Sequence, residues 1–418
     1  MESTYQLKFG KAYKEISISD KNLLAFVSPN DLPGVKDEQQ ELRKSLDQPI
    51  DSPSLKELAE NKNNVAILAS DMTRPAPSYK IIPPLLDELN EAGVEDENIT
   101  VYFGLGYHRE HTEEEKKALV GEEIYNRINC VDHELDNCIN IGTSSQGTPI
   151  EVLKPVYESD LIIGTGNLEL HYRAGYSGGH KALMPGVCSK ATIQKNHEMK
   201  FKSGTAPGKI EGNPLRDDIE EIGEMACVQF ILNVVLNTKK EIVKSVAGHP
   251  INAHREGVKY VDDMYKYEIP KKGDIVIASA GGYPKDVNLY QAQKGLENAS
   301  YAVKDGGTII LLAECREGLG DETFADWMLK AKTIEKPIDW ILEEFILGAH
   351  KAAVICQVLQ RANASLISVI PKETVKTCFF EPFMTLEEAY DNAIKKAGEN
   401  AEVVVMPYAN STMPEVKG

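Results

Sequence analysis

Polar side chains with potential chemical roles first appear at Ser70–Pro75, which reads SDMTRP and follows an apolar run. Arg74 is the strongest candidate in this segment, because a guanidinium presents two parallel N–H donors to a carboxylate or a phosphate. Asp71 and Thr73 are also common turn residues that bond to their own backbone, so an ordinary turn explains the segment equally well. We expect Arg74 to contact an anion if the segment is functional.

The second segment is 104–111, GLGYHREH, and its candidate is His108. An imidazole titrates near neutral pH, which suits a residue that moves protons between a strand end and a helix start. A lone histidine more often has a structural role or lies in solvent. The two glycines do not extend to a dinucleotide-binding GxGxxG, because Arg109 occupies the position of the last glycine.

The third segment is glycine-rich and contains His171, Gly178, Gly179 and Lys181, with His197 further along the chain. Backbone amides of such a loop can surround a phosphate, although the GxxxxGK[ST] pattern of nucleotide-binding loops is missing. Lys181 can be read as a covalent anchor or as a cation for phosphate, and His197 as a ligand or as an exposed helix residue. Together they indicate attachment of a cofactor or a metal.

The fourth segment, NLYQAQK, covers Asn288–Lys294. In a helix that begins there, Tyr290, Gln291 and Lys294 share one face close to the N-terminus, where the helix dipole favours an anion. A solvated amphipathic helix is the usual alternative for this pattern. The segment therefore predicts, at best, a contact for a carboxylate.

These segments follow apolar runs that read as buried strands at 65–70, 99–104 and 160–164, with helical patterns between them at 79–92 and from Thr112 onward. Thr112 and Glu115 have the spacing of a capping box. A hairpin is expected from 228–237 and 241–246. Alternating strands and helices predict an α/β fold with largely parallel sheets, which bind ligands at the carboxyl ends of their strands.

The pattern restarts after the polar segment 269–274, IPKKGD. Strands are expected at 275–280, 308–312, 366–370 and 403–406, and helices at 251–267, 289–303 and 385–397. We therefore predict two α/β domains, 1–266 and 274–401, with a final segment 402–418 that joins either one. Pro270 and Gly273 bracket either a hinge between the domains or an ordinary exposed turn.

Composition narrows the classes of partner. Lys and Arg number 46 and Asp and Glu number 64, a formal charge of −18, so nucleic acid and anionic membranes are not expected partners. The chain has no apolar run of about 18 residues and no signal-peptide pattern at its start, which predicts a cytoplasmic protein. Seven cysteines without a CxxC motif predict neither a disulfide framework nor a thiolate zinc site.

The order of the segments resembles that of the nickel-dependent lactate racemase family. The segments that carry the resemblance are SDMTRP, GYHREHT, GNLELHYRAGYSGGHKALMPG, the histidine of QKNHE, and NLYQAQK. None of them is specific alone, but five in the same order along nearly the whole chain are. The resemblance implies a two-domain α/β racemase of 2-hydroxy acids, with the active site in the cleft between the domains.

The resemblance also implies a covalently attached cofactor, a nickel(II) pyridinium thioamide thiocarboxylate mononucleotide installed by separate maturation enzymes. Without those enzymes the chain is expected to be free of cofactor. The implied assignments are Lys181 for covalent attachment, His197 for nickel, His108 and His171 for proton transfer, Asp71, Met72, Thr73 and Arg74 for cofactor contacts, and Arg74, Tyr290, Gln291 and Lys294 for the substrate. His180, next to the anchor, is either a bystander or a competing metal ligand.

The implied reaction interconverts the L and D forms of a small 2-hydroxy acid, with lactate as the first expectation. Removing a proton from Cα would create a carbanion beside a carboxylate, whereas reversible hydride transfer avoids this charge. A second 2-hydroxy acid such as malate, a nicotinamide-dependent oxidoreductase and a binding protein for a phosphorylated metabolite remain alternatives. The oligomeric state stays open, with a homo-oligomer among the options.

Overall fold

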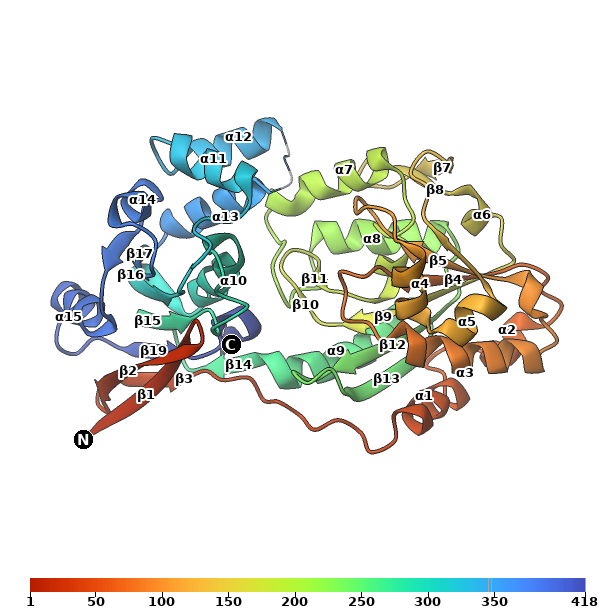
Figure 1. Ribbon diagram of the computed structural model, residues 1–418, viewed down its shortest axis with the longest axis horizontal. Helices are drawn as coiled ribbons and strands as arrows, with labels where there is room; N and C mark the ends of the chain where they lie inside the picture. Colours follow the sequence, from red (N-terminus) through yellow and green to blue (C-terminus); the bar gives the residue numbers. More distant parts are fainter. Residues whose placement is uncertain (345, 347, 418) are drawn as a thin grey trace. The chain divides into compact units, whose positions relative to one another are not determined.

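The computed structural model describes residues 1–344, 346 and 348–417, with Phe201 described by its backbone alone. The chain divides into two compact units (Figure 1). One is continuous, Asp31–Met264, and the other combines Met1–Asn30 with the chain from Tyr265 onward. We call them the 31–264 unit and the terminal unit. The α/β architecture with largely parallel sheets confirms the predicted fold class.

The 31–264 unit contains a six-stranded sheet in the order β13-β12-β9-β4-β5-β6. All neighbours are parallel except the β12–β13 hairpin, which confirms the hairpin expected from the sequence. The strands are β4 (Val65–Ser70), β5 (Ile99–Gly104), β6 (Asn129–Asp132), β9 (Leu161–Leu168), β12 (Phe230–Leu236) and β13 (Ile242–Gly248).

Helices cover both faces of this sheet because its central strands are apolar on both sides. Val65 and Ile67 of β4 belong to the core cluster under α1–α5, whereas Ala66 and Leu68 belong to the cluster under α6–α8. Figure 1 shows α1 and α3 on one side of the sheet and α7 and α8 on the other. The helices are α1 (Glu38–Asp47), α2 (Leu55–Ala59), α3 (Ser78–Glu91), α4 (Glu113–Val120), α5 (Glu122–Arg127), α6 (Lys154–Tyr157), α7 (Lys190–Glu198), α8 (Pro214–Met225) and α9 (Pro250–Tyr265).

Side-chain caps fix where several of these helices begin. The side chain of Thr112 accepts the backbone N–H of Glu115, whose carboxylate accepts the N–H of Thr112 in return, so the predicted capping box is confirmed. Asn213 caps α8 and is followed by Pro214, whose fixed φ suits a first helical turn. Two-stranded ribbons extend the unit: β7 (Cys138–Thr143) with β8 (Pro149–Leu153), and β10 (Leu170–His171) with β11 (Gly175–Tyr176).

The terminal unit contains a second six-stranded sheet, in which every neighbouring pair is parallel, in the order β18-β17-β16-β15-β19-β3. Its strands are β3 (Leu23–Phe26), β15 (Gly273–Ser279), β16 (Val303–Leu312), β17 (Asn363–Ile367), β18 (Glu381–Phe383) and β19 (Val403–Met406). The helices are α10 (Leu289–Ser300), α11 (Glu322–Lys330), α12 (Lys336–Glu343), α13 (His350–Leu359), α14 (Lys372–Thr377) and α15 (Leu386–Ala397). The pairs β1 (Glu2–Phe9) with β2 (Ala12–Ser19) and β14 (Lys266–Ile269) with β20 (Met413–Val416) complete it.

The structure differs from the predicted division at both ends of the chain. Residues 1–30, expected in the N-terminal domain, belong to the terminal unit, where β3 pairs with β19. Residues 402–418 do not join the N-terminal half, because β19 lies between β15 and β3 and β20 pairs with β14. Parallel neighbours need not be close in sequence, so no local pattern reveals this pairing.

The polar segment 269–274, expected between the two domains, also lies elsewhere in the fold. Lys266–Ile269 form β14, which pairs with β20, and β15 begins at Gly273, so the segment lies inside the terminal unit. The chain passes between the units at two places instead, after Asn30 and after Met264. Pro270 and Gly273 therefore do not bracket the passage.

The seven cysteines carry free thiols, in agreement with the sequence. None of the helices in the described part of the chain is long and apolar enough to cross a membrane.

Candidate active site

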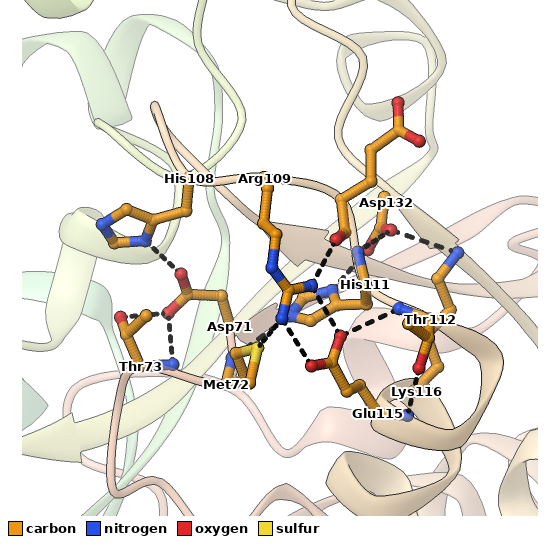
Figure 2. A network of polar contacts seen from close by, with 11 residues as sticks. Asp71, Met72, Thr73, His108, Arg109, His111, Thr112, Glu115, Lys116 and Asp132 are labelled. Atoms are coloured by element: carbon orange, nitrogen blue, oxygen red, sulfur yellow. Dashed lines mark hydrogen bonds and ion pairs between the residues drawn. The ribbon is translucent and has the colours of Figure 1, made fainter.

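His108 and Asp71 form a hydrogen-bonded pair on the loops that follow β5 and β4 (Figure 2). Asp71 Oδ2 bonds to His108 Nδ1, while Asp71 Oδ1 accepts the backbone N–H of Thr73 at 3.2 Å and its hydroxyl at 2.8 Å. Burial opposes ionisation of Asp71, but the bonds from His108 and Thr73 outweigh it, and its pKa lies below the usual range. A carboxylate at Nδ1 places the proton of a neutral imidazole there, which leaves a lone pair on Nε2. The His108 side chain is 43% exposed, so Nε2 is reachable.

The parallel register of β4 and β5 brings this pair together, since Ser70 lies opposite Gly104 and both strands end there. The loop after β5 also packs closely on the segment that follows Lys181. A Cβ at Gly104 would lie 2.8 Å from the Cα of Gly186, and a Cβ at Gly186 would lie 2.1 Å from the carbonyl oxygen of Ala182. Only glycine permits this approach of backbones.

His171 ends the short strand β10 in the loop after β9. Its Nδ1 accepts the backbone N–H groups of Arg173 at 3.3 Å and of Ala174 at 3.0 Å, so the proton of the neutral ring belongs on Nε2. Burial, followed by the charges of Lys181 and Arg74, lowers the pKa of His171 well below its usual value. At neutral pH this imidazole is uncharged.

Lys181 lies in a short 3₁₀ helix, Gly179–Ala182, that a glycine turn initiates. Gly178 and Gly179 have φ of 73° and 60°, a region that disfavours other residues, and the N–H of Gly179 donates to Asn233 Oδ1 at 2.8 Å. Burial, followed by Arg216 and Arg74, lowers the pKa of Lys181 well below its usual value. A lysine with a lowered pKa has a larger neutral, nucleophilic fraction than an ordinary lysine at the same pH.

Arg74, Lys200 and Arg216 each lower the pKa of both His171 and Lys181, and we call these five residues the cationic cluster. Lys200 is buried, and this burial lowers its pKa to about 7. So many basic groups together in a chain of charge −18 indicate a binding site for an anion. The phosphate of a mononucleotide meets that requirement, which the sequence suggested only through Arg74 and Lys181.

The two remaining histidines of this region differ in surroundings. His197 lies half-buried in the last turn of α7, three residues before Lys200. The His180 ring packs on α8, because a Cβ at Gly223 would lie 2.2 Å from His180 Cγ. Burial lowers the pKa of His180 to about 3, so this ring is an uncharged packing group at neutral pH.

No group of three or more His, Cys, Asp or Glu side chains in the described part of the chain has the arrangement of a metal site. A metal ion held by His197 therefore needs its other donors from a bound group. The cationic cluster, the Lys181 amine with its lowered pKa and the His197 imidazole on α7 have the chemistry that fits a pincer group with its own sulfur and carbon donors.

The predicted carboxylate contacts lie in the terminal unit, in the first turns of α10. Asn288 caps this helix by accepting the N–H of Gln291 at 3.0 Å. Lys351 lies in an apolar helix and was not singled out from the sequence. Its Nζ lies 3.6 Å from the centre of the Tyr290 ring and donates to the Tyr290 carbonyl oxygen at 2.8 Å. Burial, and then Lys294, lowers the pKa of Lys351 to about 7. This part of the terminal unit is thus a second site with basic groups, which contains Tyr290, Gln291, Lys294 and Lys351.

The comparisons with known proteins cover both units. Residues 9–207 match the family model of the lactate racemase N-terminal domain, and residues 269–413 match that of the lactate racemase C-terminal domain. A lactate racemase from Thermoanaerobacterium thermosaccharolyticum is 35% identical over 88% of this chain and 89% of its own length. One from Lactiplantibacillus plantarum is 35% identical over the same shares.

Solved structures agree. The lactate racemase apoprotein from Thermoanaerobacterium thermosaccharolyticum has a TM-score of 0.88 and 32% identity, covering 99% of this chain and 100% of that one. A protein from Thermotoga maritima, with a TM-score of 0.61 and 16% identity over 92% of this chain and 100% of its own, shares the fold. With both domain models matched in order and two relatives aligned along most of its length, the chain belongs to the lactate racemase family.

Proposed function

We propose that this chain racemises lactate, with His108 and His171 as the proton-transfer groups and a nickel-pincer nucleotide attached through Lys181. The observation that carries the proposal is the Asp71–His108 pair, which leaves a reachable imidazole nitrogen for proton transfer, and the lowered pKa of Lys181 in the cationic cluster supports it. Two relatives at 35% identity are lactate racemases, which supports lactate as the substrate.

The residues assigned to the cofactor have suitable chemistry. Lys181 supplies the amine for covalent attachment, His197 supplies an imidazole for nickel, and Arg74 and Lys200 offset the charge of the nucleotide phosphate. Asp71, Met72 and Thr73 line the same loop as Arg74. When bound, the pincer group supplies a carbon that accepts the Cα hydrogen as hydride and returns it to either face.

His108 acts as the base for the substrate hydroxyl. Its Nε2 lone pair accepts the hydroxyl proton, and Asp71 stabilises the imidazolium that results and holds the ring in the required tautomer. Burial of Asp71 makes this charge pair stronger than it would be in water. Deprotonating the hydroxyl pushes electrons toward a ketone at Cα, as loss of hydride requires.

His171 serves the opposite face. Its Nδ1 accepts two backbone N–H groups, so the neutral ring presents Nε2–H and donates a hydrogen bond to the substrate oxygen. An anionic group bound in the cationic cluster would raise the pKa of His171 by offsetting Lys181 and Arg74. If Nδ1 then releases the two amides and takes up a proton, Nε2 can give its proton to the substrate oxygen in one direction and accept the hydroxyl proton in the other.

The family resemblance assigns the substrate carboxylate to Arg74, Tyr290, Gln291 and Lys294. A guanidinium and an ammonium are the donors that hold a carboxylate best while the keto acid turns between faces. A site that excludes water also protects the intermediate.

The deciding experiment uses protein produced with the maturation enzymes and supplied with separate L- and D-hydroxy acids. Circular dichroism should show loss of optical activity for lactate from both enantiomers without added nicotinamide, and intact mass should show an adduct on Lys181. Preference for malate would make malate, and not lactate, the substrate. A requirement for nicotinamide, or binding of a phosphorylated metabolite without turnover, would overturn the proposal in favour of the oxidoreductase or the binding protein.

A further inference from the structure

His111 has no assigned role, yet it connects the ends of three neighbouring strands (Figure 2). Its Nε2 accepts the backbone N–H of Met72 at 3.2 Å, just after β4. Its Nδ1–H donates to Asp132 Oδ1 at 2.6 Å, at the end of β6. Its ring packs edge-on against Phe103 of β5, with ring centroids 5.3 Å apart.

Both ring nitrogens of His111 are therefore engaged, and its side chain is only 1% exposed. A nitrogen that is already bonded and buried has no position from which to meet a substrate. Asp132 fixes the tautomer, since it also accepts the backbone N–H of His111 at 2.9 Å and pairs with Lys116 at 3.2 Å. The carboxylate holds the ring proton on Nδ1 and leaves the Nε2 lone pair for Met72.

The residue that receives this lone pair directly follows Asp71. Asp71 must keep its two oxygens aligned with Thr73 and His108, and a loop without an anchor at Met72 would let this carboxylate move. A second link between the same loops runs from Arg109 to Met72 Sδ at 3.4 Å, but Arg109 is exposed and bonded mainly to Glu115 at 2.6 and 2.8 Å. Of the two side chains that link these loops at Met72, His111 is thus the buried one.

We propose that His111 is a positioning residue, whose Nε2 lone pair holds the Met72 amide and thereby keeps Asp71 in place to orient His108. The inference rests on the proposed role of His108 as a base. The inference gives a role to the series of contacts from Lys116 through Asp132 to His111, which supports the loop of Asp71 without bonding to His108.

Two substitutions separate the bonds of His111. His111→Gln places an amide oxygen where Nε2 lies and keeps an acceptor for Met72. His111→Asn places an amide nitrogen where Nδ1 lies, keeps the donor to Asp132 and removes that acceptor. His133→Gln is the matched control, because His133 is a buried histidine next to Asp132 whose ring nitrogens have no partner among the described residues.

The first readout is hydrogen exchange of the peptide that contains Met72, measured in the folded chain with no substrate. We expect protection in the wild type, His111→Gln and His133→Gln, and loss of protection in His111→Asn. Retained protection in His111→Asn overturns the inference. This arm does not depend on the reaction, so it remains decisive even if the chain proves not to racemise lactate.

The second readout is kcat and KM of the matured enzyme. Misplacing a catalytic group by about 1 Å costs up to roughly 100-fold, so His111→Asn should lower kcat about 10- to 100-fold with KM changed less than about 3-fold. His111→Gln should recover most of this loss. Equal losses in the Gln and Asn variants, or an equal loss in His133→Gln, would mean that His111 only fills space.

Discussion

Lys181 and His171 are two basic groups whose pKa values lie well below their usual values. Each pKa is lowered by burial and then by neighbouring cations, and a bound anion would offset those cations. The site is therefore prepared electrostatically for a ligand before that ligand arrives. A neutral amine is also what attachment chemistry requires, since only the lone pair of nitrogen can attack an electrophile.

The lowered pKa of Lys181 predicts selective labelling. Below its usual pKa a lysine is mostly protonated and unreactive, whereas a lysine with a lowered pKa has a larger neutral fraction near pH 7. Brief treatment of cofactor-free protein with acetic anhydride at pH 7, followed by peptide mass spectrometry, should modify Lys181 faster than the exposed Lys190. Lowering the pH should slow Lys181 labelling only once the pH approaches its lowered pKa.

Lys181→Ala is the companion variant. It should lose both the cofactor adduct and racemase activity, with unchanged circular dichroism, because the side chain lies in a glycine loop rather than in a core cluster. Activity in matured Lys181→Ala would show that attachment occurs elsewhere.

The proton-transfer groups make a second prediction at the scale of residues. His108→Ala and His171→Ala should each lower kcat in both directions by about 100- to 10,000-fold, the usual contribution of a general acid or base. Asp71→Asn should also lose activity, although His108 remains, because an amide can turn its N–H toward Nδ1 and favour the wrong tautomer. Near wild-type rates with loaded cofactor in any variant would assign that side chain a structural role.

At the scale of elements, the contact between the β5 end and the Lys181 segment makes a third prediction. Gly186→Ala would place a methyl group 2.1 Å from the Ala182 carbonyl, so the short helix that carries Lys181 must move. We expect a loss of about 1–3 kcal/mol in the free energy of unfolding, as for other overpacked sites, together with slower labelling of Lys181.

Gly93→Ala is the matched control. Gly93 has φ 91° but no atom within 4 Å of an added Cβ, so this variant measures backbone strain alone. It should lower thermal stability in denaturation experiments and leave Lys181 labelling unchanged. Slower labelling in both variants would show that stability, and not the contact with Ala182, governs Lys181.

Local patterns predicted the strands that carry the site because these strands are short, apolar and followed by turn residues. Val65–Ser70 and Ile99–Gly104 match β4 and β5 to the residue. The helix predicted at 385–397 begins after Thr385, whose side chain accepts the N–H of Glu388. Patterns could not predict β3 beside β19, because no residue in either strand encodes its distant partner.

The candidate site was likewise only partly predictable. Residues with distinctive chemistry in a loop, such as His108 and Lys181, were singled out from the sequence. Lys200 and Arg216 were missed because they lie on helical segments, where a basic residue usually points to solvent, and only the fold buries them. His111 was quoted within its motif but given no role, since its importance depends on Asp132, twenty-one residues away.

At the scale of the whole molecule, the continuous 31–264 unit makes the fourth prediction. It has its own sheet and core clusters on both faces, so residues 31–264 expressed alone should unfold in one cooperative transition. Lys181 should keep its selective labelling in this fragment, because the cations that lower its pKa belong to the same unit. A fragment without a thermal transition, or with Lys181 labelled like Lys190, would show that the terminal unit is required.

The pairing of β3 with β19 has a consequence for synthesis. During translation β3 leaves the ribosome before the whole of the 31–264 unit, whereas its strand neighbour β19 is made after that unit. The 31–264 unit can fold while the chain is still growing, whereas β3 must wait through that interval with an unpaired strand edge. The unit that carries Tyr290, Gln291 and Lys294 therefore becomes complete only after β19 has been made.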